Sequence, residues 1–109
     1  MIAGQGIFTK IKFKDGKFPK YSRPYLIVNV KSQDTIDVIN VSSTEGKEHK
    51  LLFPDNYPLS IFNPPFKKHS FVKLDSLCTI NLSEISYTLL HNGECLNESD
   101  LKIIQEKLQ

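Results

Sequence analysis

Cysteine is scarce in this sequence and long apolar runs are missing, and each absence narrows the class of protein. Cys78 and Cys95 are too few for a disulfide framework, so we expect two free thiols without a catalytic role. No apolar stretch approaches the roughly 20 residues of a membrane-spanning helix. The opening MIAGQGIFTK has no basic leader followed by an apolar segment, and we therefore expect no secretory signal, no membrane partner and a cytoplasmic location.

Short motifs that hold metals or nucleotides are also missing. The sequence has no glycine-rich phosphate loop, no CxxC pair and no HExxH. Its closest pairing of metal-binding types is His91 with Cys95, and two ligands do not close a zinc site, so we expect no metal and no cofactor. His49, His69 and His91 fall in predicted loops or at strand ends, where each is either a solvated side chain or a general acid or base.

The composition fits one globular domain whose charge is segregated along the sequence. A length of 109 residues predicts a single domain over 1–109, and 39% hydrophobic with 24% charged residues is typical of a soluble chain. The first 31 residues hold seven basic residues and one acidic residue, a net charge of +6, so the remainder carries −4. Such a basic segment either attracts polyanions or is a solvated lysine-rich hairpin.

Alternating and β-branched segments predict a mainly β fold. We expect about five strands, at residues 7–14, 24–30, 35–42, 48–53 and 70–80. The second and third of these should pair as an antiparallel hairpin, and Gly46 should take a positive φ in a tight turn. Residues 54–68 contain four prolines and predict a long loop with little regular structure.

The C-terminal part of the sequence predicts one helix. Asn97 is placed to cap it, and Leu101, Ile104 and Leu108 follow at helical spacing. Asn81 is placed to cap a single helical turn, whereas the pattern of residues 85–93 fits an extended or a helical segment equally. Short connections between strands and one terminal helix favour a small, strongly bent sheet or β-barrel over a βαβ fold.

One pair of polar residues is expected to meet in the predicted hairpin. Arg23 stands at the head of its first strand, and Ser42 stands at the tail of its second strand, followed by Ser43. Antiparallel pairing brings Arg23 and Ser42 to the same open end. A guanidinium beside a hydroxyl suits a phosphate clamp, because arginine matches two phosphate oxygens at once. The alternative is an edge arginine next to a serine-rich hairpin end.

Four segments in register resemble the MazF/PemK-like toxins of toxin–antitoxin systems. They are RPYLIVNV, INVSS, KHSFVKLDSLCTI and LNESDLKIIQEKL, and the likeness spans roughly residues 20–108. GIFTKIKF stands where the first strand of that family begins. This chain has GIF in place of the usual GDI-like opening, and KFPKY in place of an often glycine-rich loop. The resemblance implies a small SH3-like β-barrel with a C-terminal helix that forms a homodimer.

The resemblance also implies a metal-independent endoribonuclease that cleaves single-stranded RNA. The ribose 2′-OH attacks the adjacent phosphorus and leaves a cyclic phosphate and a free 5′-hydroxyl. The family's arginine falls on Arg23 and its Thr or Ser falls on Ser42, or on Ser43 if the register slips by one. Arg23 would stabilise charge on the phosphoryl oxygens. A guanidinium is a poor general base, so the group that takes the 2′-OH proton stays open, with His49 as a candidate.

A second set of residues is expected to bind RNA beside these catalytic candidates. Lys17, Lys20 and Tyr21 precede Arg23 in a basic loop that supplies phosphate contacts and base stacking. The resemblance implies a cognate antitoxin protein as a further partner. The alternative function is a noncatalytic SH3-like binding module or a CcdB-like toxin acting on a protein target, since a shared fold does not decide between them.

Overall fold

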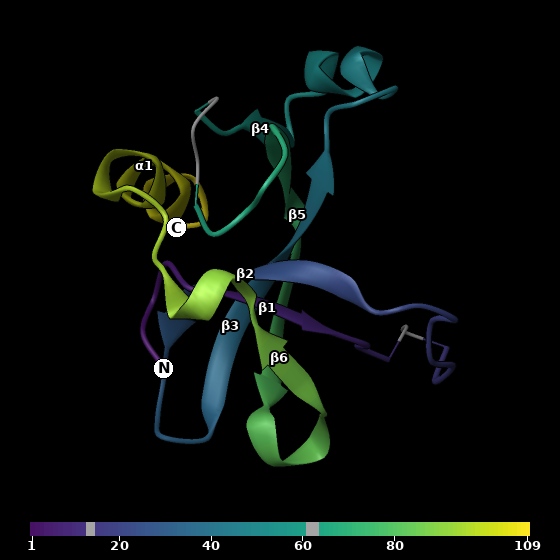
Figure 1. Cartoon of the computed structure of the whole chain (residues 1–109), viewed down its shortest axis with the longest axis vertical. Helices are drawn as coiled ribbons and strands as arrows, with labels where there is room; N and C mark the ends of the chain where they lie inside the picture. Colours follow the sequence, from purple (N-terminus) through teal and green to yellow (C-terminus); the bar gives the residue numbers. More distant parts are fainter. Residues whose placement is uncertain (13–14, 61–63) are drawn as a thin grey trace.

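The segments with strand periodicity form one antiparallel sheet in the computed structural model, which describes residues 1–12, 15–60 and 64–109 (Figure 1). Within these ranges the strands are β1 (Gly6–Thr9), β2 (Arg23–Val30), β3 (Thr35–Ser43), β4 (Asn56–Pro58), β5 (Ser70–Asn81) and β6 (Tyr87–Leu89). The helical elements are three 3-10 helices, η1 (Glu48–Leu52), η2 (Leu82–Glu84) and η3 (Leu90–Gly93), and the α-helix α1 (Glu98–Lys107). A mainly β fold with a C-terminal helix is thereby confirmed.

The strand order is β4-β5-β3-β2-β1-β6. For the part of the chain that the structure describes, this is six strands rather than about five, and β4 and β6 lie at opposite edges of an open sheet. Figure 1 shows β1 and β2 crossing the view while β5 runs along its vertical axis, so the sheet is strongly twisted. Closure into an SH3-like barrel stays a prediction.

The predicted hairpin is confirmed. β2 pairs antiparallel with β3, with Tyr25 opposite Asn40 and Leu26 opposite Ile39. β3 also pairs antiparallel with β5, so β3 has a hydrogen-bonded strand along each of its two edges. The predicted strands 24–30, 35–42 and 70–80 all form, because their β-branched and aromatic residues fill both faces of a central sheet.

β5 contains a wide bulge. Asn40 of β3 lies opposite Lys73, whereas Val38 lies opposite Cys78, so four residues of β5 face a single residue of β3 at this point. Ser76 closes the bulge, because its Oγ donates to the Lys73 carbonyl at 2.6 Å and accepts from the Asn40 N–H at 2.8 Å. The Ser76 hydroxyl therefore links the backbone of Lys73 on β5 to the backbone of Asn40 on β3.

Each face of the sheet has its own buried core. α1 covers one face, where Leu26, Val41 and Val72 pack with Ile104. The opposite face carries a second cluster that includes Tyr25 and Ile27, with Ile11, Leu82 and Ile85 packed against it.

Two strand predictions need correction. Residues 48–53 form η1 instead of a strand, because turn hydrogen bonds from Lys50 N–H to Lys47 O (2.9 Å) and from Phe53 N–H to Lys50 O (3.2 Å) replace a ladder. The strand predicted at 7–14 ends at Thr9, and its residues 13–14 lie outside the described residues. The loop predicted at 54–68 contains the short strand β4, and its residues 61–63 are likewise not described.

The C-terminal predictions hold. The side chain of Asn97 accepts from the N–H of Asp100 at 2.8 Å and begins α1. Asn81 caps η2 as expected, and the undecided stretch 85–93 divides into β6 and η3.

The prediction of a positive φ at Gly46 is also confirmed, with a value of 72°. Both cysteines are free thiols. Across the described residues, no helix is both long enough and apolar enough to cross a membrane.

Candidate nucleic-acid interface

Arg23 and Ser42 lie at the same end of the β2–β3 hairpin. Tyr25 is paired with Asn40, the last pair of this ladder, and Arg23 and Ser42 each lie two residues beyond that pair, so Arg23 projects with Tyr25 and Ser42 projects with Asn40. Residues directly opposite each other in antiparallel strands project from the same face. Both side chains therefore stand on the face away from α1, with Arg23 exposed and Ser42 half-buried. The two residues share one end and one face of the hairpin, as expected from the sequence, and a direct contact between them stays a prediction.

Ser43 stands on the other face of the sheet, because side chains alternate along a strand. It lines an apolar hollow of about 320 Å³ together with Phe8, Pro24 and Val41. Its hydroxyl accepts from the Glu45 N–H at 3.2 Å and supports the turn after β3. Of the two candidate serines, Ser42 is the one that shares a face with Arg23.

A lysine that the sequence analysis did not select contacts Ser42. Lys47 donates from Nζ to the Ser42 Oγ at 3.1 Å. The turn that follows β3 folds Lys47 back, with its N–H bonded to the Thr44 carbonyl at 2.9 Å and Gly46 in the left-handed region. The serine hydroxyl therefore contacts one cation, Lys47 on the turn, and projects from the same face as a second cation, Arg23 on β2.

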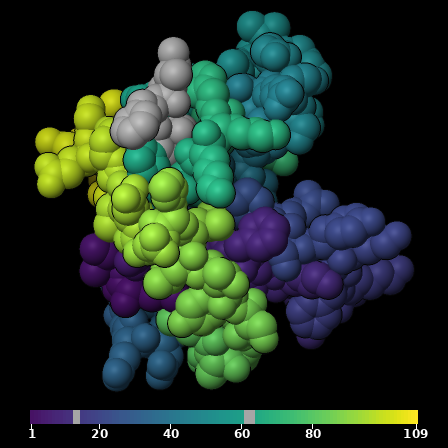
Figure 2. All heavy atoms as spheres, in the orientation of Figure 1, coloured from purple at the N-terminus to yellow at the C-terminus, as the bar shows by residue number. Residues whose placement is uncertain are grey.

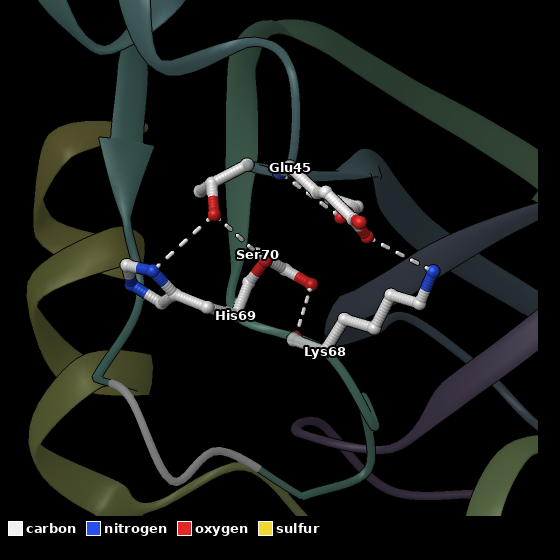
Figure 3. A network of polar contacts seen from close by, with 6 residues as sticks. Glu45, Lys68, His69 and Ser70 are labelled. Atoms are coloured by element: carbon white, nitrogen blue, oxygen red, sulfur yellow. Dashed lines mark hydrogen bonds and ion pairs between the residues drawn. The ribbon is translucent and has the colours of Figure 1, made fainter.

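A group of hydrogen bonds and one ion pair holds this turn against the start of β5 (Figure 3). Thr44 donates its N–H to the His69 carbonyl at 2.9 Å, and its hydroxyl lies 3.3 Å from His69 Nδ1. The other ring nitrogen, Nε2, lies 2.9 Å from the Leu59 carbonyl, which can only accept, so Nε2 carries the proton. Lys68 and Glu45 add an ion pair at 3.2 Å. His69 is thus a structural anchor, with both ring nitrogens engaged.

A further lysine lies on the same face as Ser42, with other cations near it. It is Lys73, half-buried on β5, and burial lowers the pKa of this lysine, as do the charges of Lys50, Lys47 and Arg23. Asp75 opposes the shift with the weakest effect. The ion pairs of the described ranges join Lys31 to Asp37 and Lys68 to Glu45, so none neutralises this group. The result is a positive end of the sheet.

Tyr25 lies two residues after Arg23 on β2 and projects from the same face of the sheet. Burial raises the pKa of Tyr25, while its hydrogen bond with Asn40 and the charge of Arg23 oppose the rise. The phenol is 9% exposed, which makes it a buried support for the site.

The predicted RNA-binding residues lie on a projection beside this end. Lys17, Lys20 and Tyr21 are exposed, with Lys20 Nζ 5.6 Å from the centre of the Tyr21 ring. Phe18, which was not selected, is 59% exposed and lies under Lys12. Figure 2 shows the surface indented between this projection and the one that carries η1.

His49 lies on η1 and is exposed. In the described part of the chain, no hydrogen bond or ion pair joins His49, Lys17, Lys20 or Tyr21 to Arg23 or Ser42. These residues flank the end of the sheet, and their contacts with RNA remain predictions.

Strand pairing identifies one more exposed aromatic residue near the site. Thr9 of β1 pairs with Arg23 on one side and with Tyr87 of β6 on the other. Tyr87 is 42% exposed and shares the face of Arg23. Neither Tyr87 nor Lys73 could be found from sequence spacing, because only the register of distant strands brings them here.

Comparison with known proteins gives no family for this chain: no family model matches it, and no curated protein matches it.

Proposed function

We propose that this protein is an endoribonuclease toxin of the MazF/PemK-like kind, which cleaves single-stranded RNA without a metal ion. The observation that carries the proposal is the shared face of Arg23 and Ser42, with Lys47 bonded to the serine hydroxyl at 3.1 Å. Three donors at one positive end of the sheet suit the nonbridging oxygens of a phosphodiester.

The proposed reaction is an internal transesterification. The ribose 2′-oxygen forms a bond to phosphorus, the bond from phosphorus to the 5′-oxygen breaks, and the products are a 2′,3′-cyclic phosphate and a 5′-hydroxyl. Arg23 stabilises the charge that grows on the phosphoryl oxygens, and Ser42 donates to one of them. The 2′-OH proton passes to a base, for which His49 on the neighbouring η1 is the candidate, and Arg23 donates the proton that the leaving 5′-oxygen gains. Exchange with water then returns both side chains to their starting protonation states.

The proposal includes a partner and an assembly. An antiparallel sheet with a C-terminal helix supports an SH3-like barrel, and a homodimer goes with that fold in the family. The exposed lysines and aromatic residues of 15–22 support binding of RNA phosphates and bases. The same positive surface suits an acidic segment of a cognate antitoxin, which would block RNA by occupying it.

The test is an RNA cleavage assay in EDTA. Purified protein is incubated with mixed-sequence RNA, and the products are separated and checked for cyclic phosphate ends. We expect discrete cuts, a loss of at least about 100-fold in Arg23→Ala and about tenfold in Ser42→Ala.

Ser43→Ala is the matched control, since Ser43 is the neighbouring serine on the opposite face. Equal effects of Ser42→Ala and Ser43→Ala would contradict the assigned geometry. RNA that is bound but stays intact at high protein concentration would favour a noncatalytic binding module, and absence of RNA binding would favour a toxin acting on a protein target.

A further inference from the structure

Lys73 is a half-buried lysine with other positive charges around it, which is unusual for this residue type. It lies on β5, between β4 and β3, and both burial and the charges of three neighbouring cations lower its pKa. A desolvated ammonium group with like charges around it destabilises a fold unless an anion compensates it. The nearby carboxylate of Asp75 is exposed and has the weakest effect of the charges around Lys73.

The backbone holds this lysine in place from both neighbouring strands. Lys73 pairs with Asn40 of β3 and with Asn56 of β4. Ser76 fixes its carbonyl inside the β5 bulge at 2.6 Å. Asn56 also donates to the Lys50 carbonyl at 2.9 Å, which holds η1 and its lysine next to the same strands. The lysine therefore does not depend on a mobile loop for its position.

The spacing from Arg23 suits a second phosphate group. Lys73 on β5 lies opposite Asn40 of β3, which lies opposite Tyr25 of β2, and Arg23 is two residues further along β2. Two spacings of about 4.8 Å between strands and two residues of about 3.3 Å along a strand therefore put the backbones of Lys73 and Arg23 roughly 12 Å or more apart. A nucleic-acid strand carries one phosphate per nucleotide, so anion sites at this separation match phosphates of nearby nucleotides on one strand.

We propose that Lys73 and Lys50 form a second phosphate site, which binds the backbone of single-stranded nucleic acid beside the phosphate held by Arg23 and Ser42. This inference rests on the proposed function for its choice of ligand. Nucleic acid is favoured over an acidic protein because exposed aromatic side chains, Tyr21 and Tyr87, accompany the cations and offer stacking surfaces for bases.

Binding without cleavage isolates this site. The probe is a fluorescein-labelled 2′-O-methyl RNA 12-mer, which lacks the attacking hydroxyl, and its affinity is measured by fluorescence anisotropy at several salt concentrations. We expect Lys73→Met to weaken binding about tenfold and to reduce the slope of log K against log salt by about 0.7, the value for one lost phosphate contact on a single strand.

Lys102→Met is the matched control, because Lys102 is an exposed lysine on α1 with the same charge. Thermal unfolding separates binding from folding: Lys73→Met is expected to unfold at the same or a higher temperature than the wild type, since it removes a repelled, desolvated charge.

The outcomes distinguish the second phosphate site from the ribonuclease. Binding by Lys73→Met equal to that of Lys102→Met would overturn the site, even if the protein cleaves RNA. Poly-glutamate should displace the probe more weakly than poly-uridine of equal charge, because it has no bases to stack on the aromatic side chains. Equal or stronger displacement by poly-glutamate would overturn the assignment to nucleic acid. Weakened binding with the expected salt slope in a protein that leaves ordinary RNA intact would support the site while refuting the ribonuclease.

Discussion

Asp100 is the residue through which α1 is fixed to the rest of the fold, and replacing it should be costly. The residue is 6% exposed, and its carboxylate accepts four hydrogen bonds: from the Ser60 N–H (3.0 Å), the Ser60 hydroxyl (2.9 Å), Asn97 Nδ2 (3.0 Å) and the Tyr57 hydroxyl (3.3 Å). Asp100→Ala removes all four and leaves these donors without their acceptor.

The expected loss follows from these contacts. A hydrogen bond to a charged group contributes about 1.5 to 3 kcal/mol, but Ser60 is exposed, so water can replace part of what is lost. A carboxylate in the first turn of α1 adds roughly 0.5 kcal/mol through the helix dipole. We therefore expect the free energy of unfolding to fall by about 2 to 3 kcal/mol, which lowers the midpoint temperature by roughly 10 to 20 °C.

Urea denaturation followed by circular dichroism measures this change. Glu106→Ala is the control, because Glu106 is an exposed acidic residue on the same helix, and it should change the free energy of unfolding by less than about 0.5 kcal/mol. A loss below about 1 kcal/mol in Asp100→Ala, or one equal to that of Glu106→Ala, would refute the view that this carboxylate anchors the helix.

Two more predictions concern stability. Burial alone would raise the pKa of Asp100, but hydrogen bonds from Ser60, Asn97 and Tyr57 outweigh it and hold the pKa below its ordinary value. Its stabilisation is therefore present above about pH 4 and is lost as the pH falls through the lowered pKa, so wild-type protein should lose stability more steeply below pH ~4 than Asp100→Asn in urea titrations; parallel pH profiles would contradict this. Gly46 has a φ of 72° with open space around it, so Gly46→Ala should cost about 1 kcal/mol by backbone strain alone, whereas Gly46→Asn should cost less; equal losses in the two variants would indicate a packing cause instead.

The sequence predicts the central strands and the caps well because their signals are local. The β-branched run of β2, the Asn97 cap and the positive φ of Gly46 each depend on a few neighbouring residues. The strand predicted at 48–53 was wrong: an apolar pair at 51–52 resembles a strand, but no strand among the described residues pairs with this segment, and Leu52 is 84% exposed.

The candidate site was predictable only in part for the same reason. Arg23 and Ser42 belong to one hairpin, so their place at the same end and on the same face follows from a short loop and antiparallel pairing. Lys73 reaches the same face through pairing between β3 and β5, and Tyr87 reaches it through β6 and β1. Both depend on contacts between residues far apart in the sequence. The number of extra residues in the β5 bulge decides which side chains face which side of the sheet, and the periodicity of the sequence does not give that number.

That bulge has a consequence for how the chain can vary. Val72 lies on the helix-covered face and Ile80 on the opposite face, although an uninterrupted strand would put two even-numbered positions on the same side. β5 therefore behaves as two short segments whose facing is set separately. Deleting a single residue between positions 74 and 77 would turn the side chains of one segment to the opposite face of the sheet relative to the other segment. Substitutions near Lys73, in contrast, leave the pairing of the segment that ends at Asn81 unchanged.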